Sequence, residues 1–295
     1  MRTTLLALLF SAVAVLMPSS ASAWGFAGHQ LIVRRAIALL PPELKPFYEH
    51  HLAEVEARIT DPDLWRSIGS DDDPNHFVDF GVPEYGPPPF LRLPREHGAA
   101  LAKFGSVVLK KYGTLPWREE EMAGGLRRAF EGMGKKSAFA ISDVTLLTGF
   151  AAHYLQDAHQ PFHATDNYDG QKTGNLDVHA RFETELIQRF ESRLQLKPAL
   201  PGAMPSARDA AFDALIVSYG DVEKILAADN LARTGKNVYD DDFFERFFVA
   251  ARPVLEERLS SAITATASLI ITTWEQAGKP VMFTEMPRTP RPVQR

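Results

Sequence analysis

The sequence predicts an all-α protein: a single, mostly helical domain with long loops. Apolar residues recur at the three-and-four spacing of one helix face in most segments of the chain. No alternating apolar and polar pattern is long enough to indicate a β-strand. The 295 residues are 45% hydrophobic and 23% charged, as in ordinary globular proteins, so disorder and coiled-coil composition are disfavoured.

The first residues are typical of a cleavable signal peptide. Arg2 precedes an apolar run from Leu5 to Met17, and Ala21-Ser22-Ala23 forms a cleavage site. The apolar run is too short to span a membrane, and no later segment is apolar enough to do so. We therefore expect residues 1–23 to be removed and the mature chain to begin at Trp24, secreted or periplasmic.

Helices are expected wherever the helical spacing persists. The predicted ranges are 30–40, 42–57, 95–111, 118–130, 137–158, 176–194, 207–228 and 241–276. Pro42 is well placed to open the second of these, because proline is tolerated in the first turn. Pro253 is expected to kink or divide the last.

Proline and glycine mark the segments between these helices. Residues 58–94 and 160–175 are predicted loops, and long loops in compact domains are usually functional or disordered. The Pro-rich tail 280–295 is expected to be loosely held. The sequence thus predicts one domain over residues 24–279.

Composition excludes several kinds of chemistry. The chain has no cysteine, which rules out thiolate zinc sites, iron–sulfur clusters, cysteine nucleophiles and disulfides. An exported protein without disulfides must be stabilised by packing or by metal. The net charge of −5 disfavours purely electrostatic capture of nucleic acid. No pattern indicates an oligomeric state.

Histidines and carboxylates are paired at helical spacing in two places. His153 and Asp157 lie four residues apart, as do His179 and Glu183, and His163 follows the first pair. One such pair alone is typical of an ion pair on a helix surface. Two pairs predict a metal site, because zinc bound without thiolates takes imidazole nitrogens and carboxylate oxygens.

Further candidate ligands lie upstream. His29 follows the new N-terminus closely, and either Asp61 or Asp63 could join His76 from the first predicted loop. Each also has a structural explanation, as a helix-start residue, an N-cap or a hydrogen-bonded loop histidine. The run Asp71 to Asp73 is interpreted as a solvated acidic turn.

The ordered motifs resemble a known family. WGFAGH, DPDLWR, NHFVDF, HYLQDAHQPFH and NLDVHARFE occur in the order found in the zinc-dependent phospholipase C and S1/P1 nuclease superfamily. The resemblance covers roughly Trp24 to Glu183. It implies a mostly helical fold around a trinuclear zinc cleft.

The resemblance also implies the ligands of three zinc ions. One ion would lie among Asp63, His76, His153 and Asp157; a second would be held by His163, His179 and Glu183; a third would take the α-amino nitrogen and carbonyl oxygen of Trp24 with His29, bridged by Asp157 to the first. Asp63 is preferred to Asp61 because the family often has an arginine three residues later, here Arg66. Asp63 would orient or deprotonate the attacking water, and Arg66 would donate to the phosphate. His159 falls outside the ligand pattern, which indicates a supporting or exposed residue.

The implied activity is that of a zinc phosphodiesterase, and two substrate classes compete. A phospholipid is favoured by Glu183 where the nucleases usually carry aspartate, by the short stretch between His163 and His179, and by the lack of cysteines. Single-stranded nucleic acid or a nucleotide is the alternative, with aromatic side chains stacking on the bases. The candidates for such stacking are Trp65, Phe77, Phe80, Tyr85 and Tyr168. The third hypothesis is an exported binding protein that zinc merely stabilises.

Overall fold

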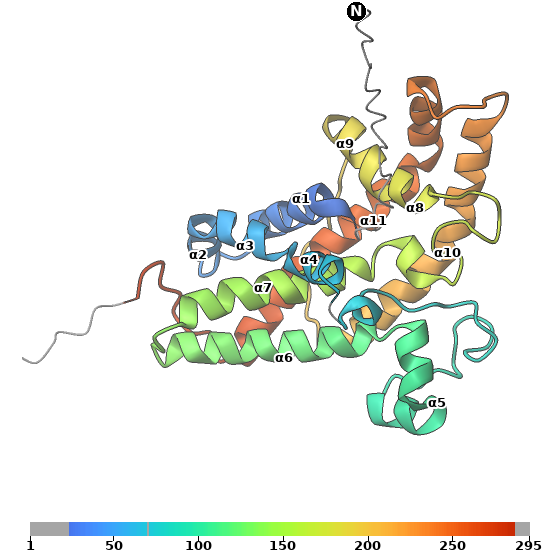
Figure 1. The fold of residues 1–295 in the computed structure, drawn as a ribbon. Helices are drawn as coiled ribbons and strands as arrows, with labels where there is room; N and C mark the ends of the chain where they lie inside the picture. The colour runs from blue at the N-terminus through green and yellow to red at the C-terminus, as the bar shows by residue number, and fades with distance from the viewer. Residues whose placement is uncertain (1–23, 70, 287–295) are drawn as a thin grey trace, which may run out of the picture.

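The computed structural model describes residues 24–69 and 71–286. The predicted signal peptide and most of the predicted tail lie outside these ranges. Within the described residues all regular secondary structure is helical and no strand occurs, which confirms a single all-α domain (Figure 1).

Long helices make the frame, and short ones carry the loops between them. The α-helices are α1 (Gly25–Ala38), α2 (Lys45–His50), α3 (Leu52–Arg58), α4 (Asp61–Ser67), α5 (His97–Tyr112), α6 (Leu115–Gly134), α7 (Ala140–Asp157), α8 (Val178–Ala180), α9 (Leu186–Phe190), α10 (Ala207–Arg233) and α11 (Asp241–Gln276). The 3₁₀-helices are η1 (Asp73–His76), η2 (Pro161–Ala164) and η4 (Glu191–Arg193), and η3 (Arg181–Glu185) is a π-helical turn.

Three of the observed elements depart from the predicted ones. The segment 42–57 forms two helices, because the backbone at His51 leaves the helical region between α2 and α3. The segment 58–94 is not all loop: α4 and η1 each accept a proline in the first turn, where its missing N–H costs nothing. Pro253 does not divide the last helix, since α11 continues through it.

The core lies between a helical hairpin and two long helices. α6 and α7 run side by side in Figure 1, α10 packs against α11, and α1 and α3 cover α7. Gly149 permits the last of these contacts, because a Cβ there would lie 2.8 Å from the backbone carbon of Arg58. The close approach brings the end of α3 onto α7 one turn before His153.

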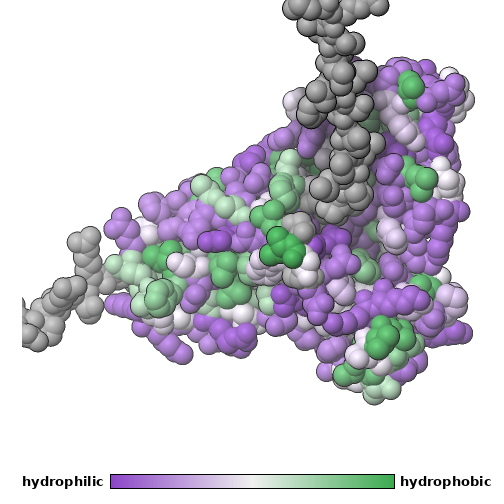
Figure 2. Space-filling view, in the orientation of Figure 1, coloured by the Kyte–Doolittle hydropathy of each residue, from purple (hydrophilic) through white to green (hydrophobic). Residues whose placement is uncertain are grey.

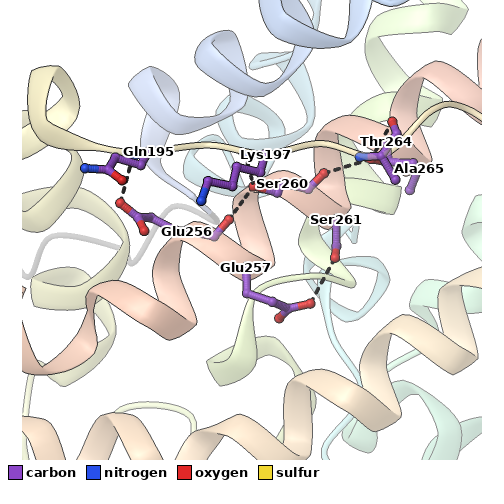
Figure 3. Close-up of a pocket in the computed structure, with 9 residues that line it drawn as sticks. Gln195, Lys197, Glu256, Glu257, Ser260, Ser261, Thr264 and Ala265 are labelled. Atoms are coloured by element: carbon purple, nitrogen blue, oxygen red, sulfur yellow. Dashed lines mark hydrogen bonds between the residues drawn. The ribbon is translucent and has the colours of Figure 1, made fainter.

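An extended strap, residues 194–206, runs along α11 between η4 and α10. Its backbone N–H groups donate to side chains that recur every four residues on α11: Gln195 to Glu256, Lys197 to Ser260, Ala199 to Thr264, Gly202 to Ser268 and Met204 to Thr272, at 2.7–3.1 Å. Figure 3 shows the part of this contact that runs from Gln195 to Thr264. Four helical residues advance about 6 Å and two extended residues about 6.6 Å, so a two-residue repeat of the strap matches the helix, with one three-residue step from Ala199 to Gly202. The strap thereby fixes the outer face of α11.

Among the described residues, no helix combines the length and apolar character needed to cross a bilayer.

Candidate metal centre

The predicted ligand side chains come from seven separate elements, which meet at the C-terminal end of α7. His153 and Asp157 lie one turn apart on that helix. The others lie on surrounding elements: His29 on α1, Asp63 on α4, His76 on η1, His163 on η2, His179 on α8 and Glu183 on η3. All eight side chains are buried, with exposed fractions of 6% or less.

Three groups of these residues have geometry that could hold a metal ion. They are His29, His153 and Asp157; Asp63, His76 and His153; and His163, His179 and Glu183, with the ligand atoms of each group within 4.8 Å of one another. The last group has the membership that the resemblance implies. The first two differ from it, because His153 is shared between them. Whether these residues ligate metal stays a prediction.

Asp157 lies at the centre of the cluster. Its Oδ2 is 2.9 Å from His76 Nδ1, 3.4 Å from His153 Nε2 and 3.8 Å from His163 Nδ1. Its other oxygen, Oδ1, is 3.3 Å from His29 Nε2. One carboxylate therefore faces four imidazoles, the position expected of a bridging ligand.

Hydrogen bonds outside the cluster orient three of the imidazoles. His153 Nδ1 bonds to the carbonyl oxygen of Ile59 at 2.8 Å. Ile59 belongs to the backbone segment that packs closely against Gly149. His29 Nδ1 bonds to Gln156 Oε1 at 2.7 Å, which leaves Nε2 facing the cluster in both rings. His76 instead turns Nδ1 inward and bonds through Nε2 to Asp72. Such bonds to the second ring nitrogen are the usual way proteins set a histidine for metal.

Asp72 is a supporting residue that the sequence interpretation missed. The acidic run was expected to be solvated, but Asp72 is 7% exposed and contacts His76 Nε2 at 3.2 Å. Tyr154 donates a hydrogen bond of 2.7 Å to the same carboxylate. Although burial alone raises the pKa of Asp72, its hydrogen bonds with His76 and Tyr154 hold that pKa well below the usual range. The four-residue spacing from Asp72 to His76 was the available signal.

Several buried polar atoms of the cluster lack a hydrogen bond of good geometry, although His29 Nε2 lies 3.3 Å from Asp157 Oδ1 and His179 Nε2 lies 2.9 Å from Glu183 Oε2. They are His29 Nε2, Asp157 Oδ1, His179 Nε2 and Glu183 Oε1. Leaving a buried donor or acceptor unsatisfied costs about 1–3 kcal/mol per group. Because these are the nitrogen and carboxylate oxygen atoms that zinc prefers, the residues present fit a metal ion.

Three of the ligands have protonation states that suit metal binding, whereas in His29 and His76 the hydrogen bond with Asp157 outweighs burial and raises the pKa. Burial lowers the pKa of His153 well below its usual value and that of His163 to about 3, so both rings are neutral at pH 7. Burial alone would raise the pKa of Asp157, but its four imidazole neighbours lower it strongly, so it stays ionised. A metal ligand must be deprotonated, and these three already are.

Trp24 lies at the edge of the cluster. Its backbone nitrogen is 2.9 Å from Glu183 Oε2, and its indole N–H donates to the carbonyl oxygen of Gln156 at 2.8 Å. Its carbonyl oxygen accepts from Gly28 N within the first turn of α1. The contact of its nitrogen is thus with the His163, His179 and Glu183 group, whereas the resemblance assigned Trp24 to the ion of His29.

The helix that carries His179 and Glu183 is held by a buried ion pair. Arg181, between them, donates through Nε to Asp229 of α10 at 3.0 Å, and Asn175 donates to the other carboxylate oxygen at 2.7 Å. The π-helical turn begins at Arg181, and such turns are frequent at functional sites.

A cavity of about 410 Å³ opens beside the cluster. Its lining includes His163 and His179 together with Arg66 from α4 and Lys111 from α5. Asp79 also lines it, and burial next to Asp166 raises the pKa of its carboxyl to about 7. A pocket of this size and charge can admit a phosphate ester.

The remaining candidate residues differ in whether they belong to one of the three ligand groups. Asp63 belongs to a ligand group, whereas Asp61 pairs with Arg58 at 3.1 Å. Arg66 donates to Asp73 through Nε at 2.9 Å, and its Nη1 lies 3.7 Å from Asp63. His159 is buried beyond the three groups, where the charges that act on its pKa are those of Arg258 and Glu257.

Two of the five aromatic candidates reach the cavity. Phe77 and Tyr168 line it, and Tyr168 is 53% exposed. Phe80 stacks on Phe90 and is buried, as is Tyr85, so these two rings serve packing. Trp65 packs edge-on against Phe150.

No family model matches the chain, and no curated protein matches it in sequence. The fold and the buried clusters are accordingly what the findings show, and the family remains a resemblance.

Proposed function

We propose that the protein is an exported, zinc-dependent phosphodiesterase, and that phospholipid is its substrate. The observation that carries the proposal is the convergence of three buried groups of potential ligands beside an open, partly basic cavity. A structural zinc site would be closed, whereas a catalytic one keeps access for substrate. Here His163 and His179 belong to a ligand group and also line the cavity.

The ligands would be those of the three groups, with Asp157 between them. Bound zinc would supply Lewis-acid stabilisation of the phosphate and would make an attacking water acidic near neutral pH. Trp24 N, 2.9 Å from Glu183, supports the further proposal that cleavage after Ala23 frees an amine at the cluster. N-terminal sequencing of the exported protein tests that cleavage.

Two side chains would act on the substrate itself. Asp63, at the edge of the cluster, would orient the attacking water and accept its proton. Arg66, held by Asp73, lines the cavity and would donate to a phosphate oxygen there.

The lining of the cavity supports a phospholipid headgroup. Phe77 and Tyr168 offer ring faces that attract an alkylammonium group, and Asp79, whose pKa is raised to about 7, adds a negative charge in its ionised form. Glu183 and the short 163–179 stretch favour the same substrate through the resemblance. The same two rings could stack on a base, so single-stranded DNA is the second substrate to test.

The decisive experiment combines metal analysis with two substrates. Purified protein beginning at Trp24 is loaded with zinc and assayed for diacylglycerol release from phosphatidylcholine and for nucleotide release from single-stranded DNA. We expect zinc in the protein by elemental analysis, diacylglycerol release, and loss of that release after chelation. Nucleotide release instead would make the protein a nuclease, and bound zinc without either product would make it a binding protein.

Asp63→Asn and Asp61→Asn form a matched pair on one helix. Because only Asp63 lies in a ligand group, Asp63→Asn should lower kcat about 10²–10³-fold, the usual effect of losing a general base or ligand. Asp61→Asn should leave kcat within twofold, since Asp61 only pairs with Arg58 at the surface. Equal activity of the two variants would remove Asp63 from the mechanism.

A further inference from the structure

α5 is the least buried of the long helices. Of its 16 residues only Ala100 and Leu109 are buried, whereas the core-facing α7 buries 13 of 18. Apolar side chains are nevertheless exposed on and beside it: Leu101 at 42%, Val107 at 80% and the preceding Leu91 at 86%. Figure 2 shows a green patch at the lower right, in the region where α5 lies in Figure 1. Removing these apolar side chains from water would be favourable, so an exposed patch of this kind indicates a binding partner.

The same segment is basic in an acidic protein. Residues 91–112 contain five lysines and arginines against the single acid Glu96, while the whole chain carries −5. Arg95 pairs with Asp213, and Lys110 lies 3.5 Å from Asp71. Within the described part of the chain, Arg92, Lys103 and Lys111 form no ion pair with a carboxylate. Exposed apolar side chains among free cations are the composition of a surface that binds anionic lipid.

α4 presents a second apolar patch across the cavity. Leu64 is 44% exposed and Ile68 is 80% exposed, and Figure 2 shows a green area near the centre of the same face, where α4 lies in Figure 1. Arg66 of α4 and Lys111 of α5 line the same cavity. The two helices that carry these exposed apolar residues thus both contribute a basic side chain to the cavity.

We infer that α4 and α5 form a docking surface for an anionic phospholipid bilayer, which sets the cavity mouth against the lipid headgroups. Leu91, Leu101 and Val107 enter the interface, together with Leu64 and Ile68 from the other side. Arg92 and Lys103 contact the anionic headgroups. This inference rests on the proposed function and extends it, because it names the surface through which the protein would reach its phospholipid substrate.

Charge and exposed apolar area together favour a bilayer over nucleic acid. A nucleic-acid site would need basic side chains with stacking rings, yet the exposed apolar residues of α5 are aliphatic. Aliphatic side chains bind by leaving water for hydrocarbon, which a bilayer offers.

Vesicle sedimentation tests the surface without relying on catalysis. Zinc-loaded protein is mixed briefly on ice with large vesicles of phosphatidylcholine, with or without 30 mol% phosphatidylglycerol. We expect the anionic vesicles to bind at least about fivefold more protein. Leu101→Ser/Val107→Ser should weaken binding roughly tenfold, and so should Arg92→Gln/Lys103→Gln.

The matched control is Leu231→Ser/Val249→Ser, which alters equally exposed apolar residues on α10 and α11. It should bind vesicles like the wild type, and all variants should have the same circular dichroism and melting temperature. Equal binding by the control and the Leu101/Val107 variant overturns the inference. The inference is also overturned if only the Arg92→Gln/Lys103→Gln variant loses vesicle binding and single-stranded DNA competes with the vesicles.

Hydrolysis of dihexanoyl phosphatidylcholine, dispersed as monomers, separates this inference from the proposed function. The Leu101/Val107 variant should hydrolyse the monomers at the wild-type rate and the vesicles more slowly. If no lipid is hydrolysed but vesicle binding still needs Leu101 and Val107, the docking surface stands and the proposed function fails. If the monomers are hydrolysed but the Leu101/Val107 variant binds vesicles like the wild type, the proposed function stands and the docking surface fails.

Discussion

Two fully buried aspartates, Asp157 and Asp229, have opposite surroundings. Asp229 faces Arg181 and Asn175, so a cation and an amide donor satisfy its carboxylate within the protein. Asp157 faces four imidazoles: burial lowers the pKa of His153 and His163, whereas contact with Asp157 outweighs burial and raises the pKa of His29 and His76. Its Oδ1 makes no hydrogen bond. A buried charge whose partner is in the chain is structural, whereas one left with ligand atoms to spare points to an external cation.

The Asp229 pair is itself part of how the metal centre is built. It anchors the turn between His179 and Glu183 to α10, far from the cluster in sequence. Arg181 also lies 4.3 Å from the ring of Tyr239, which leaves its charge little access to water. The two aspartates should therefore respond differently to substitution, one through metal and the other through folding.

The largest effect is expected at Asp157. Asp157→Asn removes the central charge of the cluster, so the protein should bind at least one zinc ion fewer by elemental analysis. Activity on phosphatidylcholine should fall about 10³-fold, which corresponds to about 4 kcal/mol of transition-state stabilisation. A full zinc content in this variant would contradict the conclusion that Asp157, rather than Asp229, is the metal-binding aspartate.

The second effect is expected at Asp229. Asp229→Ala leaves Arg181 buried without its anion, so the free energy of unfolding should fall by about 3–5 kcal/mol in urea denaturation. Zinc content below the melting transition should stay at the wild-type value. The control is Asp213→Ala on the same helix, whose exposed pair with Arg95 should contribute less than about 1 kcal/mol.

The smallest effect is expected at Glu119, a third buried acid with neither partner nor ligand geometry. Its side chain in α6 is fully buried, both carboxylate oxygens lack hydrogen bonds, and burial raises its pKa well above 4.5. Glu119→Met should stabilise the protein by about 1–3 kcal/mol, because it removes an unsatisfied polar group.

The gain from Glu119→Met should also depend on pH. The folded protein holds the Glu119 proton more tightly than the unfolded chain, so the wild type loses stability as pH rises above about 4.5. The variant lacks that loss, and its advantage should be larger at pH 8 than at pH 5. Glu120→Gln, on the exposed face of the same helix, should show no such dependence.

Much of the helical frame and the candidate ligands could be predicted from local patterns. The 241–276 helix was predicted with its observed ends, since Asp240 caps it and the periodicity is unbroken. His153 and Asp157 were found through their four-residue spacing. Asp72 was missed, because a run of three aspartates looks solvated until His76 and Tyr154 are seen to bond to the middle one.

The sequence by itself determined the helical class, the absence of thiolate chemistry and the two histidine–carboxylate pairs, because composition and helical spacing act over a few residues. Only the tertiary structure decided that Asp63 rather than Asp61 joins the cluster, and that Asp157 meets four imidazoles from different elements. It also showed that the strap donates hydrogen bonds to Glu256, Ser260, Thr264, Ser268 and Thr272. The spacing of these residues is visible in the sequence, but their partners are not. Hydrogen bonds and ligand sets join residues distant along the chain, and packing alone selects which of them meet.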